Sequence, residues 1–311
     1  MSRTVWVECV PNFSEGRRPD VLRRLAVAAA REGVRVLGLS ADADHNRAVL
    51  TLAGDGEAVG EAVFRAAAEA VAHIDMRVHR GTHPRMGAVD VIPFVPLGDT
   101  SMNVCVQLAR TLGERLGREL HLPVYLYERA ATRPERRNLA DVRRPQFEGL
   151  SAWLKEPMHR PDFGPVEAHP TAGAVAVGAR APLIAFNVFL NSRDMGVAER
   201  VARAVRGSSG GLRGVKALAM DTASRGQVQV SLNLTDPRRT SMAAALEMVR
   251  REAARYGASV TQTELVGFTP LDAVVDAARY YLQLQALDKN QILEWVLSQP
   301  PPEDLPGFDA R

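Results

Sequence analysis

The chain has 311 residues, of which 46% are hydrophobic and 24% are charged. This composition excludes a chain that is disordered throughout, because such a chain is poorer in apolar residues, and the length suggests two domains or one large one. Apolar stretches such as Leu183–Leu190 are far shorter than the roughly 20 residues that cross a bilayer. Glu8 interrupts the N-terminal segment where an export signal needs apolar residues. With only two cysteines, we expect a cytoplasmic protein that has no disulfide framework and no structural zinc site.

The charged residues give a net charge of +3, from 39 basic and 36 acidic side chains. This excess is too small for a protein that coats nucleic acid. Nearly all the basic residues are arginines, because Lys155, Lys216 and Lys289 are the only lysines. Arginine binds carboxylates and phosphates through two parallel hydrogen bonds, which favours anionic small-molecule partners. A bias in the base composition of the genome explains the arginines equally well.

The first half of the chain alternates strand and helix patterns. The spacing of apolar residues predicts, in order, a strand at Thr4–Val10, a helix from Pro19, strands at Val34–Ser40 and Arg47–Ala53, a helix at Gly56–Ala72 and a strand at Val89–Val95. This β-α-β-β-α-β order is that of the split βαβ, or ferredoxin-like, unit. A helix at Met102–Glu119 and a strand at Pro123–Tyr127 follow.

A polar, proline-containing stretch from Ala131 to about Gly173 indicates a long connection between two lobes. The second half then repeats the first, with strands at Leu183–Leu190, Val215–Met220, Gln227–Asn233 and Ser259–Leu265, and helices at Asp194–Arg206, Thr240–Tyr256, Leu271–Leu284 and Asn290–Leu297. We therefore predict an α+β sandwich of two tandem ferredoxin-like lobes, residues 1–178 and 179–311, the second ending in a proline-rich tail. Each lobe leaves one sheet face open, and the groove between the two faces is the natural place for a ligand.

The segment His-Arg-Gly-Thr-His-Pro-Arg-Met-Gly-Ala-Val-Asp, from His79 to Asp90, has the strongest chemical signal. Histidine has an unperturbed pKa close to neutrality and so suits general acid–base catalysis. The glycines allow a backbone to approach a ligand closely. The segment indicates an acid–base site, in which Asp90 either orients a histidine or caps backbone groups.

A metal site is a second interpretation of this segment, because His79 and His83 are four residues apart, as in zinc proteases. Gly81 and Pro84 oppose a helix there, and the glutamate of the zinc motif is missing. A purely structural pair of loop histidines is a third interpretation. We predict no metal. The alternative is a metal-dependent hydrolase using His79, His83 and Asp90, which insensitivity to chelators and the absence of bound metal in elemental analysis would exclude.

Two more loops precede helices or strands at positions suited to a ligand. The loop Val10–Arg18 joins a buried strand to a helix N-terminus, where anions bind, or it is an ordinary turn. The turn from Asp42 to Arg47 is either a solvated hairpin or a ligand-facing loop. Cys9 and Cys105 lie in apolar patterns, so we expect them in the core and predict no covalent nucleophile.

Six motifs occur in an order that is typical of one family. They are Val7–Gly16, His79–Asp90, Tyr125–Tyr127, Pro161–Pro165, Gly178–Arg180 and Leu183–Asn187. Together they closely resemble glutamate formimidoyltransferase, the formiminotransferase domain of the formiminotransferase-cyclodeaminase family. The resemblance runs from about Val5 to Leu284, nearly the whole chain.

This resemblance implies two lobes of α/β sandwich form with a folate in a positively charged groove between them. It implies transfer of a formimino group between N-formimino-L-glutamate and the N5 amine of tetrahydrofolate, the co-substrate, in histidine degradation. The catalytic histidine of the family's His-Pro-Arg-Met-Gly motif is His83 here, and the folate-contacting stretch is Gly164–Gly173. A histidine of near-neutral pKa could take a proton from the attacking nitrogen and give one to the departing nitrogen.

Both substrates carry carboxylates, so arginines in or near the matched motifs are expected to bind them. The candidate substrate-binding residues are Arg47, His79, Arg85, Gly164, Pro165, His169, Gly173 and Arg180.

The expected partners are these small molecules and a second copy of the chain, with no nucleic acid and no membrane. Only 5% of the residues are aromatic, which is unlike an RNA-binding sheet face. Animal members of the family continue into a cyclodeaminase domain, and this chain ends before one could begin, so a separate cyclodeaminase is expected to act next. The alternative function is a non-catalytic folate-binding protein, which would not need His83.

Overall fold

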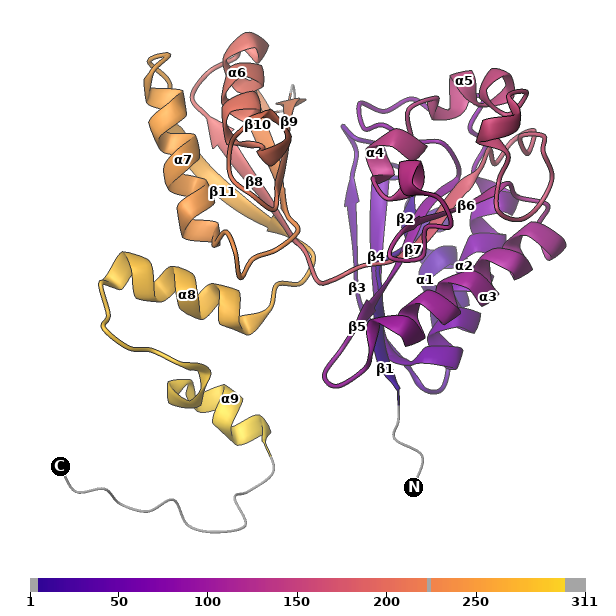
Figure 1. Ribbon diagram of the computed structural model, residues 1–311, viewed down its shortest axis with the longest axis horizontal. Coiled ribbons are helices and arrows are strands. Elements are labelled where there is room, and N and C mark those ends of the chain that lie inside the picture. The colour runs from indigo at the N-terminus through magenta and orange to yellow at the C-terminus, as the bar shows by residue number, and fades with distance from the viewer. Residues whose placement is uncertain (1–4, 223–224, 300–311) are drawn as a thin grey trace. The chain divides into compact units, whose positions relative to one another are not determined.

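The computed structural model describes residues 5–222 and 225–299, and the chain divides near Pro182 into two compact units (Figure 1). The strands of the first unit are β1 (Trp6–Cys9), β2 (Asn12–Phe13), β3 (Val34–Asp42), β4 (Arg47–Asp55), β5 (Val89–Pro96), β6 (Val124–Glu128) and β7 (Val175–Ala179). Its α-helices are α1 (Pro19–Ala29), α2 (Gly56–His73), α3 (Met102–Glu119), α4 (Leu139–Val142) and α5 (Gln146–Trp153). The α+β class predicted from the sequence is confirmed.

One mixed sheet forms the centre of the first unit. Strands β1 and β2 both pair antiparallel with β4 on one side and β5 on the other, so they share one position in the strand order, between β4 and β5. The predicted strand at Thr4–Val10 is confirmed as β1. Pro11, which has no N–H to donate, interrupts the pairing, and the chain pairs again at Asn12, where a loop was predicted. Strand β3 pairs with the outer side of β4, and β7 and then β6 add to β5 in parallel.

Helices α1, α2 and α3 cover one face of this sheet (Figure 1). Their apolar sides pack on strand residues such as Leu50, Leu52, Ile92 and Phe94, all fully buried. A second, smaller cluster on other strand side chains, among them Val91 and Tyr125, is completed by residues of α4 and α5. The rest of the sheet face that carries this second cluster holds the polar residues described below.

The stretch from Ala131 to Gly173 does not connect two lobes as predicted. It contains α4, α5 and the short 3-10 helices η1 (Pro134–Arg136) and η2 (Pro157–His159), and it returns to the same sheet as β7. Parallel strands such as β6 and β7 need a long crossover, and this stretch is that crossover. Strand β7 also runs across the predicted lobe boundary at Gly178, and the first unit continues to Pro182.

The second unit has a four-stranded sheet in the order β11-β8-β10-β9. Its elements are β8 (Ile184–Leu190), α6 (Met195–Val205), η3 (Gly207–Ser209), β9 (Val215–Thr222), β10 (Gln227–Leu234), α7 (Met242–Ala254), β11 (Val260–Val266), α8 (Leu271–Leu282), η5 (Lys289–Gln291) and α9 (Leu293–Ser298). Strands β10 and β11 flank β8 antiparallel. Helices α6 and α7 bury their apolar sides on this sheet and form a separate core. The predicted proline-rich tail lies outside the described residues.

Local sequence signals account for the helix starts. Pro19 begins α1, as a residue whose missing N–H is not needed there. The side chains of Asp55, Asp194 and Ser241 accept backbone N–H groups at the starts of α2, α6 and α7. Within residues 5–222 and 225–299, no helix is long and apolar enough to cross a membrane.

Candidate functional site

Three loops of the first unit meet at one end of its sheet: residues 14–18 after β2, the turn 42–47 between β3 and β4, and residues 79–87 before β5. At two positions the backbones of these loops approach so closely that no side chain would fit between them. A Cβ on Gly16 would lie 2.1 Å from the carbonyl oxygen of Asp42, and one on Gly81 would lie 2.2 Å from that of His45. Glycine at both positions lets the three backbones pack together.

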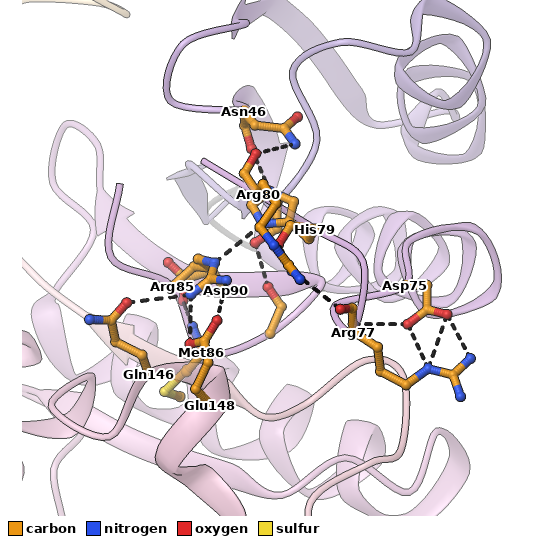
Figure 2. A network of polar contacts seen from close by, with 12 residues as sticks. Asn46, Asp75, Arg77, His79, Arg80, Arg85, Met86, Asp90, Gln146 and Glu148 are labelled. Atoms are coloured by element: carbon orange, nitrogen blue, oxygen red, sulfur yellow. Dashed lines mark hydrogen bonds and ion pairs between the residues drawn. The ribbon is translucent and has the colours of Figure 1, made fainter. Parts of the chain in front are cut away.

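Asn46 fastens these loops to one another. Its backbone adopts a left-handed conformation with a φ of 48°, which asparagine tolerates better than most residues. Its side-chain oxygen accepts a hydrogen bond from the Gly16 N–H at 2.9 Å, and its amide nitrogen donates to the Arg80 carbonyl at 3.0 Å. Its own carbonyl accepts from Nε2 of His79 at 2.9 Å (Figure 2).

Both ring nitrogens of His79 are engaged by the protein. Because a carbonyl only accepts, Nε2 of His79 carries the proton that it shares with Asn46, and Nδ1 accepts from Nε of Arg85 at 3.2 Å. Burial lowers the pKa of His79 below its ordinary value. The histidine predicted to bind substrate therefore supports the loop and presents no nitrogen to a ligand in this structure.

Arg85 is similarly committed. Its two terminal nitrogens lie 2.9 and 2.6 Å from the carboxylate oxygens of Glu148 on α5, and the first is also 3.4 Å from the Gln146 side chain (Figure 2). The guanidinium is buried and Glu148 is largely exposed. The carboxylate that Arg85 binds here thus belongs to the protein itself. The ion pair holds α5 against residues 79–87, the histidine loop.

A second group of charges lies on the strands beside these loops. Asp90, fully buried near the start of β5, accepts from Nη1 of Arg47 on β4 and pairs with Nη2 of Arg143, both at 2.8 Å. Its other oxygen accepts from the Met86 N–H at 2.9 Å. Burial alone would raise the pKa of Asp90, but the Arg143 and Arg47 guanidiniums and these hydrogen bonds hold that pKa below its ordinary value. Asp90 is therefore ionised, and the group carries one net positive charge.

Each arginine of this group has further donors. Arg47 uses Nε on the side-chain oxygen of Asn12 at 3.1 Å. Burial lowers the pKa of Arg47 to about 10, which still leaves it charged at neutral pH. Nε of Arg143 is buried with no hydrogen-bond partner among the described residues. In the sequence Arg143 is one of several arginines after Ala131, and nothing in such a run tells which one turns inward.

His83 lies next to these arginines, and its electrostatic state differs from the expectation. Nδ1 donates to the Pro84 carbonyl at 2.7 Å, so Nε2 is the acceptor of the neutral ring. Burial, followed by the Arg47 and Arg143 guanidiniums, lowers the pKa of His83 to about 2. The prediction of a near-neutral pKa was wrong for the free protein, because sequence spacing does not reveal two cations folded against the ring.

His45, in the turn before β4, was not among the predicted site residues. Its ring meets the His83 ring edge to face, with 6.1 Å between the centroids. Its Nδ1 lies 3.3 Å from Oδ2 of Asp42, whose other oxygen accepts the His45 backbone N–H at 2.7 Å. Its Nε2 is buried with no hydrogen-bond partner. The only sequence signal was the polar turn itself, which fitted a solvated hairpin equally well.

The predicted folate stretch runs along the same end of the sheet. Gly173, with a φ of 71°, belongs to the run whose backbone hydrogen-bonds to residues 86–88 of the histidine loop. Gly164 lies at its other end against Leu122, and Pro165 next to it is half-buried. His169 accepts the Ala172 N–H at 3.0 Å and helps to line a cavity of about 480 Å³. Other lining residues of this cavity are Arg77, Arg80, Phe147 and Glu148.

Arg180 stands apart from the histidines. Its backbone N–H donates to Phe94 toward the far end of β5, and four residues of extended strand separate that position from Asp90, which is about 13 Å. Tyr127, whose pKa burial raises to about 12, interacts with both Arg180 and Arg143. The polar residues thus extend from the histidine loops along the sheet toward Arg180.

The chemistry of the donors does not favour a metal centre. In the part of the chain that the structure describes, no three His, Cys, Asp or Glu side chains are grouped to hold a metal ion. Cys9 and Cys105 are buried and unpaired, and burial raises the pKa of both thiols, that of Cys105 to about 11. Neither thiol has the depressed pKa of a nucleophile.

Two family models together match almost the whole chain. Residues 6–180 match the N-terminal subdomain of the formiminotransferase domain, and residues 184–301 match the formiminotransferase domain. The chain belongs to the formiminotransferase family. This membership confirms the family that the sequence motifs indicated, and with it a transferase of one-carbon groups.

Relatives in this family come from distant organisms. The chain is 46% identical over 290 residues to a glutamate formimidoyltransferase of Streptococcus pyogenes serotype M1, covering 93% of this chain and 97% of that one. It is 48% identical over 291 residues to a glutamate formimidoyltransferase of Thermoplasma acidophilum, covering 93% and 96%. A formimidoyltransferase-cyclodeaminase of Rattus norvegicus is 38% identical over 316 residues, covering 98% of this chain and 58% of its own length.

Proposed function

We propose that this protein is a glutamate formimidoyltransferase, which moves the formimino group of N-formimino-L-glutamate to N5 of tetrahydrofolate. The products are 5-formiminotetrahydrofolate and L-glutamate, as in histidine degradation. The observation that carries this proposal is the placement of His83, with Nε2 as an acceptor, beside the buried Arg47–Asp90–Arg143 group. Family membership supports the same reaction.

The transfer needs one base and one acid. N5 of tetrahydrofolate attacks the formimino carbon, the new C–N5 bond forms, and His83 Nε2 takes the proton that N5 loses. The tetrahedral intermediate then breaks its bond between carbon and the glutamate nitrogen, and the same proton passes from His83 to that nitrogen. One histidine used twice balances the reaction and requires no covalent intermediate.

The depressed pKa of His83 fits this scheme once a substrate carboxylate is bound. After burial, the two causes that lower this pKa are the Arg47 and Arg143 guanidiniums. A carboxylate bound to these arginines opposes both charges, so donor binding raises the pKa of His83 toward its ordinary value. His83 then becomes a competent base only when the donor is in place, and Arg143 contributes a buried N–H that has no protein partner.

The remaining predicted residues have less direct roles in this proposal. His79 and Arg85 position the loop that carries His83 and do not bind the substrate themselves. The stretch Gly164–Gly173, with Pro165 and His169, and Arg180 stay candidates for contacts to the folate. We propose the two compact units as the two lobes of the enzyme, the first of which supplies the proton-transfer residues. A cytoplasmic location, a homodimer and a separate cyclodeaminase stay predictions from the sequence.

The test is turnover of N-formimino-L-glutamate with tetrahydrofolate, followed by absorbance of the folate product. We expect activity in the wild type and a loss of about 10²- to 10⁴-fold in His83→Ala. His73→Ala is the control, because it removes a histidine that pairs with Glu69 and is exposed at the end of α2, outside the site. Folate binding without turnover in the wild type would favour the non-catalytic folate-binding protein, and unchanged turnover in His83→Ala would remove His83 as the base.

A further inference from the structure

Two histidine rings from different loops, His45 and His83, are in contact and carry the same kind of free ring nitrogen. His83 uses Nδ1 on the Pro84 carbonyl, and His45 uses Nδ1 on the Asp42 carboxylate. Because a carbonyl and a carboxylate only accept, each neutral ring carries its proton on Nδ1 and has a lone pair on Nε2. The two rings are in edge-to-face contact, so two neighbouring side chains each carry one acceptor.

The acceptor of His45 lacks a partner although it is buried. Only 16% of the His45 side chain is exposed, and its Nε2 has no hydrogen-bond partner within residues 5–222 and 225–299. Buried polar atoms are nearly always hydrogen-bonded, so an unpaired one at a functional site indicates a group that arrives with the ligand. The ligand group that meets His45 must then be a donor.

The position of His45 is fixed before any ligand binds. The next residue, Asn46, is hydrogen-bonded to Gly16, Arg80 and His79. The carbonyl of His45 packs directly against Gly81, and the Asp42 carboxylate holds both its backbone N–H and its ring. A side chain held this firmly can discriminate between groups that differ by a single hydrogen-bond donor.

We propose that His45 is a specificity-determining residue that accepts a hydrogen bond from the imino N–H of the donor and so selects formimino over formyl groups. This inference rests on the proposed function. A formimino group carries N–H donors on both nitrogens and is cationic when protonated, which suits two neighbouring acceptors and the nearby Asp42 carboxylate. A formyl group has an oxygen at the same position, and an oxygen facing the Nε2 lone pair leaves two buried acceptors unpaired.

Asp42 acts through His45 and is a positioning residue. Its carboxylate keeps the proton of His45 on Nδ1, which leaves Nε2 as an acceptor. Without this carboxylate the ring could place its proton on Nε2 and would then donate to a formyl oxygen.

The test compares N-formimino-L-glutamate and N-formyl-L-glutamate as donors to tetrahydrofolate in the wild type, His45→Gln and His73→Gln. In His45→Gln we expect the ratio of kcat/KM for the formimino donor to kcat/KM for the formyl donor to fall about 10- to 100-fold, the value of one hydrogen bond to a charged group, because a glutamine amide can accept through its oxygen or donate through its nitrogen. We expect kcat/KM for the formyl donor to stay the same or rise, because the glutamine amide can donate to the carbonyl oxygen. His73→Gln removes a histidine that is also 3.3 Å from a carboxylate, and it should leave both values unchanged.

An unchanged ratio of the two kcat/KM values in His45→Gln would overturn the role of His45 while leaving the proposed function in place. A wild type inactive with both donors would refute the proposed function itself, and the inference with it. A wild type that prefers the formyl donor would overturn the inference alone.

A measurement on the unmodified enzyme covers the case in which His45→Gln does not fold. With ¹⁵N-labelled histidine, we expect the Nε2 resonance of His45 to start as an unprotonated acceptor and to shift when N-formimino-L-glutamate is added. N-formyl-L-glutamate at the same occupancy should leave it in place. Equal shifts with both ligands, or a His45 ring protonated at Nε2 in the free enzyme, would contradict the proposal.

Discussion

Arg47 and Arg143 share one carboxylate, that of Asp90, and His83 lies within their field. Removing Asp90 would leave two buried cations side by side, and breaking a buried pair in this way is far more costly than losing an exposed one. Burial of the ring, together with the excess of positive charge that remains, keeps His83 neutral. At the scale of single residues, the group therefore binds anions and sets the protonation state of the base at the same time.

The neutral state of His83 has a consequence for stability. Its folded-state pKa of about 2 lies below the value of about 6.5 expected in the unfolded chain, so below pH 6.5 the unfolded state binds a proton that the folded state does not. Stability is therefore lost as the pH falls from about 6.5. This loss is absent in His83→Gln. Between pH 6 and pH 4, the free energy of unfolding of the variant should therefore rise relative to that of the wild type by up to about 1.4 kcal/mol per pH unit.

Urea unfolding of both proteins from pH 4 to pH 8 measures this difference. Above pH 7.5 the difference between their free energies of unfolding should be constant. His73→Gln, which changes an exposed histidine, should follow the wild-type curve. Parallel curves for the wild type and His83→Gln down to pH 4 would mean that His83 is protonated in the folded enzyme.

At the scale of elements, the site depends on how closely the turn before β4 packs against the loop before β5. Gly81 lies where a Cβ would be 2.2 Å from the His45 carbonyl oxygen, so Gly81→Ala must push the two loops apart. We expect a loss of about 1–3 kcal/mol in the free energy of unfolding, the usual cost of overpacking. Turnover of N-formimino-L-glutamate should fall as well, because His45 and His83 are separated by the same movement.

Gly60→Ala is the matched control for this substitution. Gly60 lies within α2 with no atom near its virtual Cβ, so alanine there should raise the free energy of unfolding by about 0.5–1 kcal/mol and leave turnover unchanged. Thermal unfolding and initial rates measure both effects. Wild-type stability and activity in Gly81→Ala would show that the two loops are not held at a fixed distance.

Periodicity predicted the long elements well and the short ones poorly. The helix Met102–Glu119 has the same bounds in the sequence prediction and in the structure, because its buried side recurs over eighteen residues. Helix α5 has only eight residues, and β7 is a run of small residues after several prolines, so neither has a periodic signal of its own. Missing β7 made a crossover within one sheet look like a link between two lobes.

For the site, too, the local sequence pattern was informative and the long-range contacts were not predictable. The motif around His83 forms a single loop beside the buried arginines, but the partners that define each side chain are distant in sequence. The carbonyl that binds His79 is 33 residues away, and the carboxylate that binds Arg85 is 63 residues away. Such partners are set by the fold, so the sequence could not show that His79 and Arg85 support the loop in this structure.

At the scale of the whole molecule, the two units have separate hydrophobic cores. The clusters of the first unit are built from residues up to Ala179, and that of the second begins at Ile184. The proton-transfer and specificity residues argued above all belong to the first unit. Both units nevertheless match models of the formiminotransferase family, so we expect the second unit to take part in the function proposed above.

Tetrahydrofolate should therefore protect backbone amides in both units against hydrogen exchange. A ligand that binds only the folded state stabilises what it contacts, by about 2.7 kcal/mol at a hundred times its Kd. We expect slower exchange in the first unit at residues 79–90 and 164–173, and in the second unit within the sheet strands β8 and β10. Helix α9, in which no residue is buried, is the internal control and should exchange equally fast with and without folate. Protection confined to the first unit would mean that folate binds that unit alone. The second unit would then be expected to bind the glutamate donor. The same exchange experiment with N-formimino-L-glutamate would test this.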